Sequence, residues 1–84
     1  MIHHANSDFW FCYRNLPEDI QQLADKAYSL LRSNPRHPSL QFKKVGDLWS
    51  ARINLNYRAL AVKTSDGYVW FWLGTHKEYE KLLG

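Results

Sequence analysis

The 84-residue sequence is short of cysteine and of long apolar runs, and each shortage excludes a class of protein. Its single cysteine, Cys12, cannot form an internal disulfide, so a reduced cytoplasmic setting is expected. No apolar run approaches the roughly 20 residues that a membrane span needs, and the first residues lack the basic start and apolar stretch of a signal peptide. We therefore expect a cytoplasmic protein with no membrane partner.

Nucleotide-binding and metal-binding patterns are also missing. The four glycines are scattered and form neither a GxGxxG nor a Walker pattern. His3 and His4 are adjacent near one end of the chain, and His37 stands between Arg36 and Pro38, so their spacing does not suit a metal. No Ser-His-Asp or Cys-His spacing indicates a nucleophile. We expect no cofactor and no metal.

The composition indicates one folded domain, which we expect to span residues 1–84 with a flexible stretch at 1–7. Apolar residues make up 45% and aromatic residues 15% of the chain, which argues against disorder. Residues 36–63 hold six of the 11 basic residues but only one of the eight acidic residues. This basic stretch is either a solvated face or a site for a polyanion such as nucleic acid.

Hydrophobic periodicity and turn residues predict the element order β-α-β-β-β-β-α. The expected strands cover residues 8–14, 39–45, 49–54, 57–63 and 68–73. One expected helix begins at Pro17 and ends at Ser33–Pro35, and a short one begins near His76. The fold class is therefore α+β, with a mostly antiparallel sheet of four or five strands. The long N-terminal helix packs on one face of this sheet.

The strand at 68–73 is apolar on both faces, so we expect it inside the sheet and covered on both sides. Strict alternation would put Val69, Phe71 and Leu73 on one side. It would put Tyr68, Trp70 and Trp72 on the opposite side. The following helix then carries His76 and Tyr79, three residues apart, on one face at the end of the sheet.

Six residues could form a site for a phosphate. Arg52 and Arg58 lie on predicted strands, and Lys43 and Lys44 point to opposite faces of another, so at most one of these lysines faces the site. Cations of this kind stabilise the negative charge that grows on a phosphate during RNA cleavage, while His and Tyr can move protons. Each residue also has a structural alternative. The arginines could be solvated, His76 could cap the helix, and Tyr79 could only pack on the sheet.

Ordered motifs across residues 9–83 carry a resemblance to a known family. They are Leu16-Pro17, Asn34-Pro35-Arg36-His37-Pro38-Ser39-Leu40, Trp49-Ser50-Ala51-Arg52-Ile53, Asn56-Tyr57-Arg58-Ala59-Leu60 and Trp70-Phe71-Trp72-Leu73-Gly74-Thr75-His76-Lys77-Glu78-Tyr79. With these motifs in this order, the chain resembles the RelE/ParE superfamily of bacterial type II toxin–antitoxin toxins.

The resemblance implies a compact α/β fold with an antiparallel sheet and a cognate antitoxin whose tail wraps the toxin. RelE-type members are endoribonucleases that cut mRNA on the ribosome without metal, by attack of a ribose 2′-OH on the adjacent phosphate. Carried over to this chain, Arg52 and Arg58 hold the phosphate, and His76 and Tyr79 do acid–base work. Lys43, Lys44 and Arg36 are the further expected RNA-binding or phosphate-binding residues.

Two departures from the RelE pattern leave alternatives open. No carboxylate on the middle strands matches the general base of some relatives, which leaves the base open between His76 and one of the two lysines. Only one helix fits before Pro35, whereas some relatives have two. The alternatives are a ParE-like protein that inhibits DNA gyrase without being an enzyme, and a degenerate toxin that only binds its antitoxin.

Overall fold

The computed structural model describes residues 2–83, so the two ends of the predicted domain, Met1 and Gly84, lie outside the described residues. The elements in chain order are β1 (Ile2–Ala5), α1 (Ser7–Arg14), α2 (Glu18–Ser33), β2 (Lys43–Val45), β3 (Leu48–Arg52), β4 (Tyr57–Lys63), β5 (Gly67–Thr75) and α3 (His76–Leu83). The strands form one sheet in the order β1-β5-β4-β3-β2. Only the β1–β5 pair is parallel. These findings confirm the predicted α+β class and the mostly antiparallel sheet.

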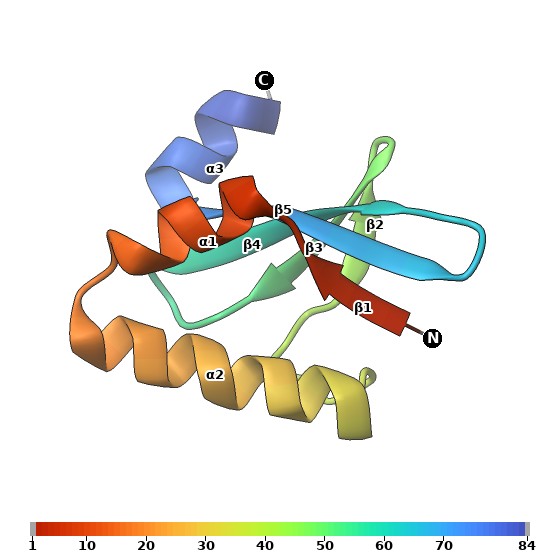
Figure 1. The fold of residues 1–84 in the computed structure, drawn as a ribbon, viewed down its shortest axis with the longest axis horizontal. Helices are drawn as coiled ribbons and strands as arrows, with labels where there is room; N and C mark the ends of the chain where they lie inside the picture. Colours follow the sequence, from red (N-terminus) through yellow and green to blue (C-terminus); the bar gives the residue numbers. More distant parts are fainter. Residues whose placement is uncertain (1, 84) are drawn as a thin grey trace.

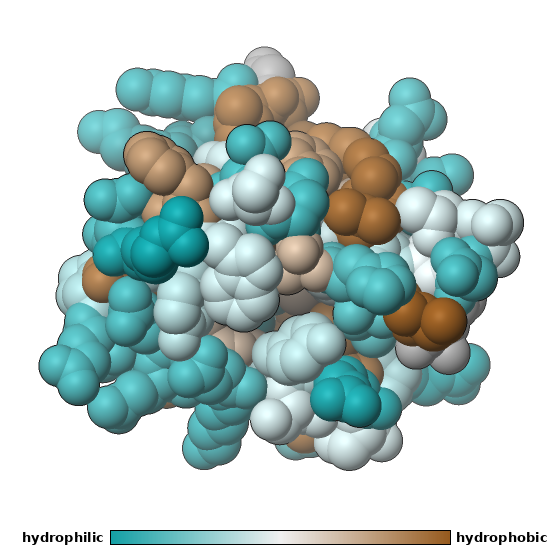
Figure 2. Space-filling view, viewed as in Figure 1, coloured by the Kyte–Doolittle hydropathy of each residue, from teal (hydrophilic) through white to brown (hydrophobic). Residues whose placement is uncertain are grey.

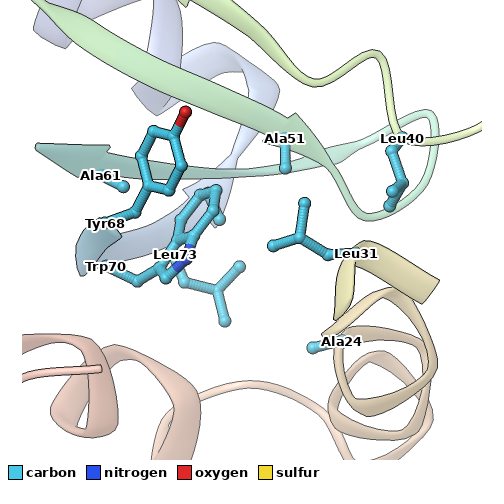
Figure 3. Close-up of a cluster of buried hydrophobic side chains, with 9 residues drawn as sticks. Ala24, Leu31, Leu40, Ala51, Ala61, Tyr68, Trp70 and Leu73 are labelled. Carbon is cyan, nitrogen blue, oxygen red and sulfur yellow. The ribbon is translucent and has the colours of Figure 1, made fainter. Parts of the chain in front are cut away.

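The sheet is a layer between helices, with α2 below it and α3 above it in Figure 1. The core lies on the α2 side, where side chains from the helix point toward those of the sheet (Figure 3). Its buried members are Ala24, Leu31, Leu40, Ala51, Ala59, Ala61, Tyr68, Trp70 and Leu73. None of the helices within residues 2–83 is long and apolar enough to cross a membrane.

The segment expected to be a strand at residues 8–14 is instead helix α1, so two helices precede Pro35. The aromatic residues of this segment suggested a strand, but its capping chemistry favours a helix. The Asn6 side chain accepts a hydrogen bond from the Phe9 N–H at 3.0 Å. Asp8 in the first turn and Arg14 in the last turn suit the helix dipole. Phe9 and Tyr13, four residues apart on one helix face, then pack against the core cluster to which α2 also contributes.

The N-terminal stretch, expected to be flexible over residues 1–7, contains an ordered strand. Ile2–Ala5 pair with residues 67–70 of β5, and Asn6 N–H donates to the Trp70 carbonyl at 3.0 Å. Gly67 is needed here, because a Cβ at this position would lie 1.8 Å from the Ile2 carbonyl oxygen. Sequence patterning missed β1 because an edge strand of four residues has too few side chains to show a period.

The interior position of β5 is confirmed, since β1 and β4 flank it. Its predicted alternation holds only in the first half. The register of β4 against β5 shifts between Leu60 and Ala61, whose partners are Trp72 and Trp70, so Phe71 is an extra residue on β5. The bulge lets Trp70 and Leu73, three residues apart, enter the same core cluster.

His3 joins β1 to an aromatic cluster and makes the stability of this edge depend on pH. Its ring stacks on Tyr68 with centroids 5.3 Å apart, and its Nδ1 accepts from the Trp70 Nε1–H at 3.1 Å. Desolvation by burial lowers the pKa of His3 below its ordinary 6.5, and positive charge that includes Arg32 adds to this effect.

A His3→Gln substitution should therefore reduce the pH dependence of unfolding. A lowered folded-state pKa means that the unfolded chain binds the proton more tightly. The contribution of His3 is thus complete above about pH 6.5 and is lost as the pH falls through the folded-state value. Urea unfolding between pH 8 and pH 5 measures this slope. His4→Gln, on the exposed side of the same strand, is the matched control and should retain the slope of the wild type. Equal slopes in all three proteins would contradict this account.

Candidate functional site

The candidate site centres on two arginines that face each other across neighbouring strands. Arg52 at the end of β3 pairs in register with Arg58 near the start of β4. Both side chains lie on the sheet face opposite the core, since the adjacent Ala51 and Ala59 are buried in the core cluster. Like charges directly opposite each other destabilise an antiparallel pair, so this arrangement favours an anion between them.

The loop before β2 orients both guanidinium groups. The Arg52 Nε–H donates to the Ser39 carbonyl at 3.0 Å, and an Nη1–H of Arg58 donates to Gln41 Oε1 at 3.3 Å. Gln41 has a φ of 44°, in the left-handed region that residues other than glycine seldom occupy. A guanidinium has five N–H groups, so these bonds leave donors on each arginine for an anion.

His76, the first residue of α3, contacts Arg58 and the following turn of its own helix. The Arg58 Nε–H donates to His76 Nδ1 at 3.3 Å. The other ring nitrogen, Nε2, lies 2.8 Å from Oε1 of Glu80, and the two side chains are 40% and 66% exposed. His76 is therefore at the arginine pair and retains access to solvent.

Tyr79 supports this group from inside the fold. It is buried, with its ring centroid 5.7 Å from that of His76 at an interplanar angle of 24°. The Arg58 guanidinium carbon lies 5.8 Å from the centre of the same ring, within the range of a cation–π contact. The structure thus brings Arg52, Arg58, His76 and Tyr79 together at one end of the sheet.

The helix that carries His76 and Tyr79 begins with a capping box. The Glu78 N–H donates to Thr75 Oγ1 at 3.2 Å, and the Thr75 N–H donates to Glu78 Oε1 at 3.1 Å. The Thr75 hydroxyl also donates to Glu78 Oε1 at 2.9 Å. The hydrogen bonds that the Thr75 backbone N–H and hydroxyl donate to this carboxylate lower the pKa of Glu78 below its ordinary 4.5. The carboxylate of Glu78 is thus committed to holding the first turn of α3.

The other three predicted phosphate-binding residues are placed differently. Lys43 pairs in register with Ser50, two residues before Arg52 on the same strand, and so shares the face of the arginine pair. Lys44 pairs with Trp49 and points to the opposite face. Arg36 is exposed in the loop after α2. None of the hydrogen bonds and ion pairs among residues 2–83 joins Arg36 or Lys44 to the four clustered side chains.

Two residues of the site were not predicted from the sequence. Glu80 stood four residues after His76, a spacing that places the two side chains on one helix face, so this signal was available. Gln41 gave no signal, because its approach to Arg58 depends on the path of an irregular loop. Among residues 2–83, no three His, Cys, Asp or Glu side chains are grouped to hold a metal ion.

Chemically, the arrangement combines three elements of a phosphate site. Two guanidinium groups offer donors to an anion, and an imidazole within hydrogen-bond distance of one guanidinium can take up a proton. A lysine on the same face adds positive charge. Figure 2 shows a surface of mixed polarity on the viewed side of the molecule, with hydrophobic residues gathered at the top, over α3. In that helix Leu82 is 57% exposed.

Comparison with protein families gives one match. Residues 18–81 match the ParE-like toxin domain family, which covers the helix α2, strands β2 to β5 and nearly all of α3. No curated protein matches the sequence significantly.

Solved structures of toxins share the fold at low sequence identity. A chain of the RelB–RelE antitoxin–toxin complex from Methanococcus jannaschii aligns with a TM-score of 0.72 and 15% identity, over 96% of this chain and 99% of that one. The isolated RelE toxin of Escherichia coli gives 0.63 and 11%, over 96% and 94%. A chain of the RelBE2 toxin–antitoxin complex from Mycobacterium tuberculosis gives 0.64 and 16%, over 88% and 95%.

Removing the Thr75 hydroxyl by a Thr75→Val substitution should destabilise the protein by about 1 kcal/mol, the usual cost of losing an N-terminal helix cap. Urea unfolding at pH 7 measures this loss. Valine keeps the backbone N–H that bonds Glu78, so the variant loses only the part of the stabilisation that comes from the hydroxyl. That part is present above the ordinary Glu78 pKa of 4.5 and fades as the pH falls through the lowered value. The difference between variant and wild type should therefore shrink at pH 3. Lys77→Ala, at an exposed position of α3, is the control. A loss no larger than that of the control would refute the role of this cap.

Proposed function

The chain belongs to the ParE-like toxin domain family, within the RelE/ParE superfamily of type II toxin–antitoxin toxins, and we propose that it is a ribosome-dependent mRNA endoribonuclease. The observation that carries this proposal is the contact of Arg58 with both His76 and Gln41, opposite Arg52. A binder that only blocks another protein has no need for two opposed arginines beside an imidazole.

In the proposed reaction the scissile phosphate binds between Arg52 and Arg58. A ribose 2′-OH gives its proton to His76 and attacks the phosphorus. The bond from phosphorus to the 5′-oxygen breaks, and this oxygen takes up a proton, for which Tyr79 is the proposed donor. The products are a 2′,3′-cyclic phosphate and a 5′-hydroxyl. The arginines stabilise the charge on the phosphorane, and Lys43 binds an adjacent part of the RNA backbone.

We further propose that a cognate antitoxin controls the toxin in the cytoplasm. Support comes from two of the similar structures, which are complexes of a toxin with an antitoxin. The basic stretch at residues 36–63 suits an acidic partner segment. The gene next to that of the toxin is the place to look for this partner.

A second candidate function is inhibition of DNA gyrase without catalysis. The name of the matching family favours it, since ParE-type toxins act in this way. The two functions differ in their demand on the site. Cleavage requires the arginine pair and His76, whereas a gyrase inhibitor tolerates their loss if the binding surface is elsewhere.

Arg58→Ala and His76→Ala should each relieve growth arrest when the toxin is expressed without its antitoxin. The loss of one group that stabilises the charged transition state should lower the cleavage rate by about 10²–10³. Primer extension on mRNA bound to translating ribosomes measures the rate, and a supercoiling assay with purified gyrase runs beside it. Co-expression of the adjacent gene should restore growth to cells with the wild-type toxin.

Lys44→Ala is the matched control, because it removes one positive charge from the opposite face of the sheet. It should cleave as the wild type does. Toxicity that survives both Arg58→Ala and His76→Ala, with supercoiling inhibited and mRNA intact, would replace the nuclease by the gyrase inhibitor. No toxicity and no effect in either assay, with the antitoxin still bound, would identify a degenerate toxin.

A further inference from the structure

The hydrogen bonds of His76 determine which of its two ring nitrogens carries the proton. A guanidinium N–H can only donate, so Nδ1, which lies 3.3 Å from the Arg58 Nε, must hold a lone pair. The proton of the neutral ring is then on Nε2, where it points at the Glu80 carboxylate at 2.8 Å. The three side chains therefore form a directed chain of hydrogen bonds, in which Arg58 donates to His76 and His76 donates to Glu80.

We propose that Glu80 is a positioning residue that holds His76 as a general base with its Nδ1 lone pair directed to the phosphate site. Without Glu80 the imidazole could turn over about its χ2 angle, which would put Cδ2 in the place of Nδ1 and direct the lone pair away from the phosphate site. The carboxylate also faces the positive charge that the ring gains when it accepts the 2′-OH proton. A carboxylate that orients a catalytic imidazole in this way is a recurring device of enzymes.

The catalytic part of this inference rests on the proposed nuclease function. Within that function it assigns the general base to His76 rather than to Lys43 or Lys44. When the phosphate draws Arg58 toward itself, the Nδ1 lone pair becomes available to the 2′-OH. The proton that moves is thus bound to Nδ1, while Nε2–H stays with Glu80 throughout. Tyr79 keeps the ring plane fixed by stacking, and Glu80 fixes which edge of the ring faces the phosphate.

The orientation of the ring can be measured without any RNA. In ¹⁵N-labelled protein we expect an imidazole Nε2–H resonance of His76 shifted downfield by the carboxylate. The Nε–H of Arg58 should show the shift of a donor to nitrogen. Glu80→Ala should remove the first signal and move the second toward that of a solvated arginine. Glu80→Gln, which keeps an acceptor oxygen but no charge, should lie between the two.

Lys77→Ala on the same helix is the control and should leave both signals unchanged. Alanine is a strong helix former, so neither Glu80→Ala nor Lys77→Ala lowers the helix propensity of α3. The backbone amide shifts of α3 report whether the helix stays folded. In the cleavage assay Glu80→Ala should be about twofold to fivefold slower than the wild type, the scale of one exposed ion pair.

The outcomes separate this proposal from the proposed function. If the signals of His76 and Arg58 change in Glu80→Ala as stated but the wild type cleaves no mRNA, the orienting role stands and the nuclease does not. If the wild type cleaves mRNA while Glu80→Ala leaves both signals and the rate unchanged, the role of Glu80 is overturned. An Nδ1–H tautomer in the wild type would overturn it as well.

Discussion

The bulge at Phe71 is the constraint on which the rest of the structure depends. Without it, Trp70 and Leu73 could not both point into the core, because residues three apart on a regular strand lie on opposite faces. By changing the alternation in mid-strand, the bulge brings Gly74 opposite Arg58 on the site face. Gly74 leaves room there, since a Cβ would lie 2.5 Å from the ring of Trp72. The core and the site are therefore fixed by the same strand, and α3 begins where that strand ends.

The elements whose hydrophobic residues recur at a clear helical or strand spacing were predictable from the sequence. The elements whose conformation is decided by tertiary contacts were not. The apolar stripe of α2 and the limits of β4 followed from side-chain spacing. Residues 8–14 were predicted to be a strand because aromatic residues favour strands on average, while the cap at Asn6 and the shared core decide for a helix. The bulge was invisible for a related reason. An extra residue on a strand that is apolar on both faces leaves no break in the pattern.

The same distinction holds for the candidate site. The four residues named from the sequence lie together because they occupy regular elements whose register is fixed by the core. The choice between Lys43 and Lys44 required the register of β2, which three residues cannot reveal by themselves. Gln41 and Ser39 act on the arginines from an irregular loop, where backbone conformation and not residue type determines what each group contacts.

The central claim is that two opposed arginines, with His76 at their side, bind a single phosphate. A titration of the labelled protein with a dinucleotide that carries 2′-deoxyribose at the cleaved position tests it most directly, since the analogue can bind but cannot react. The account predicts saturable shifts of the Nε–H signals of Arg52 and Arg58 and of the His76 ring, all with one dissociation constant. Saturable shifts confined to Arg36 or Lys44, with the two strand arginines unmoved, would contradict it.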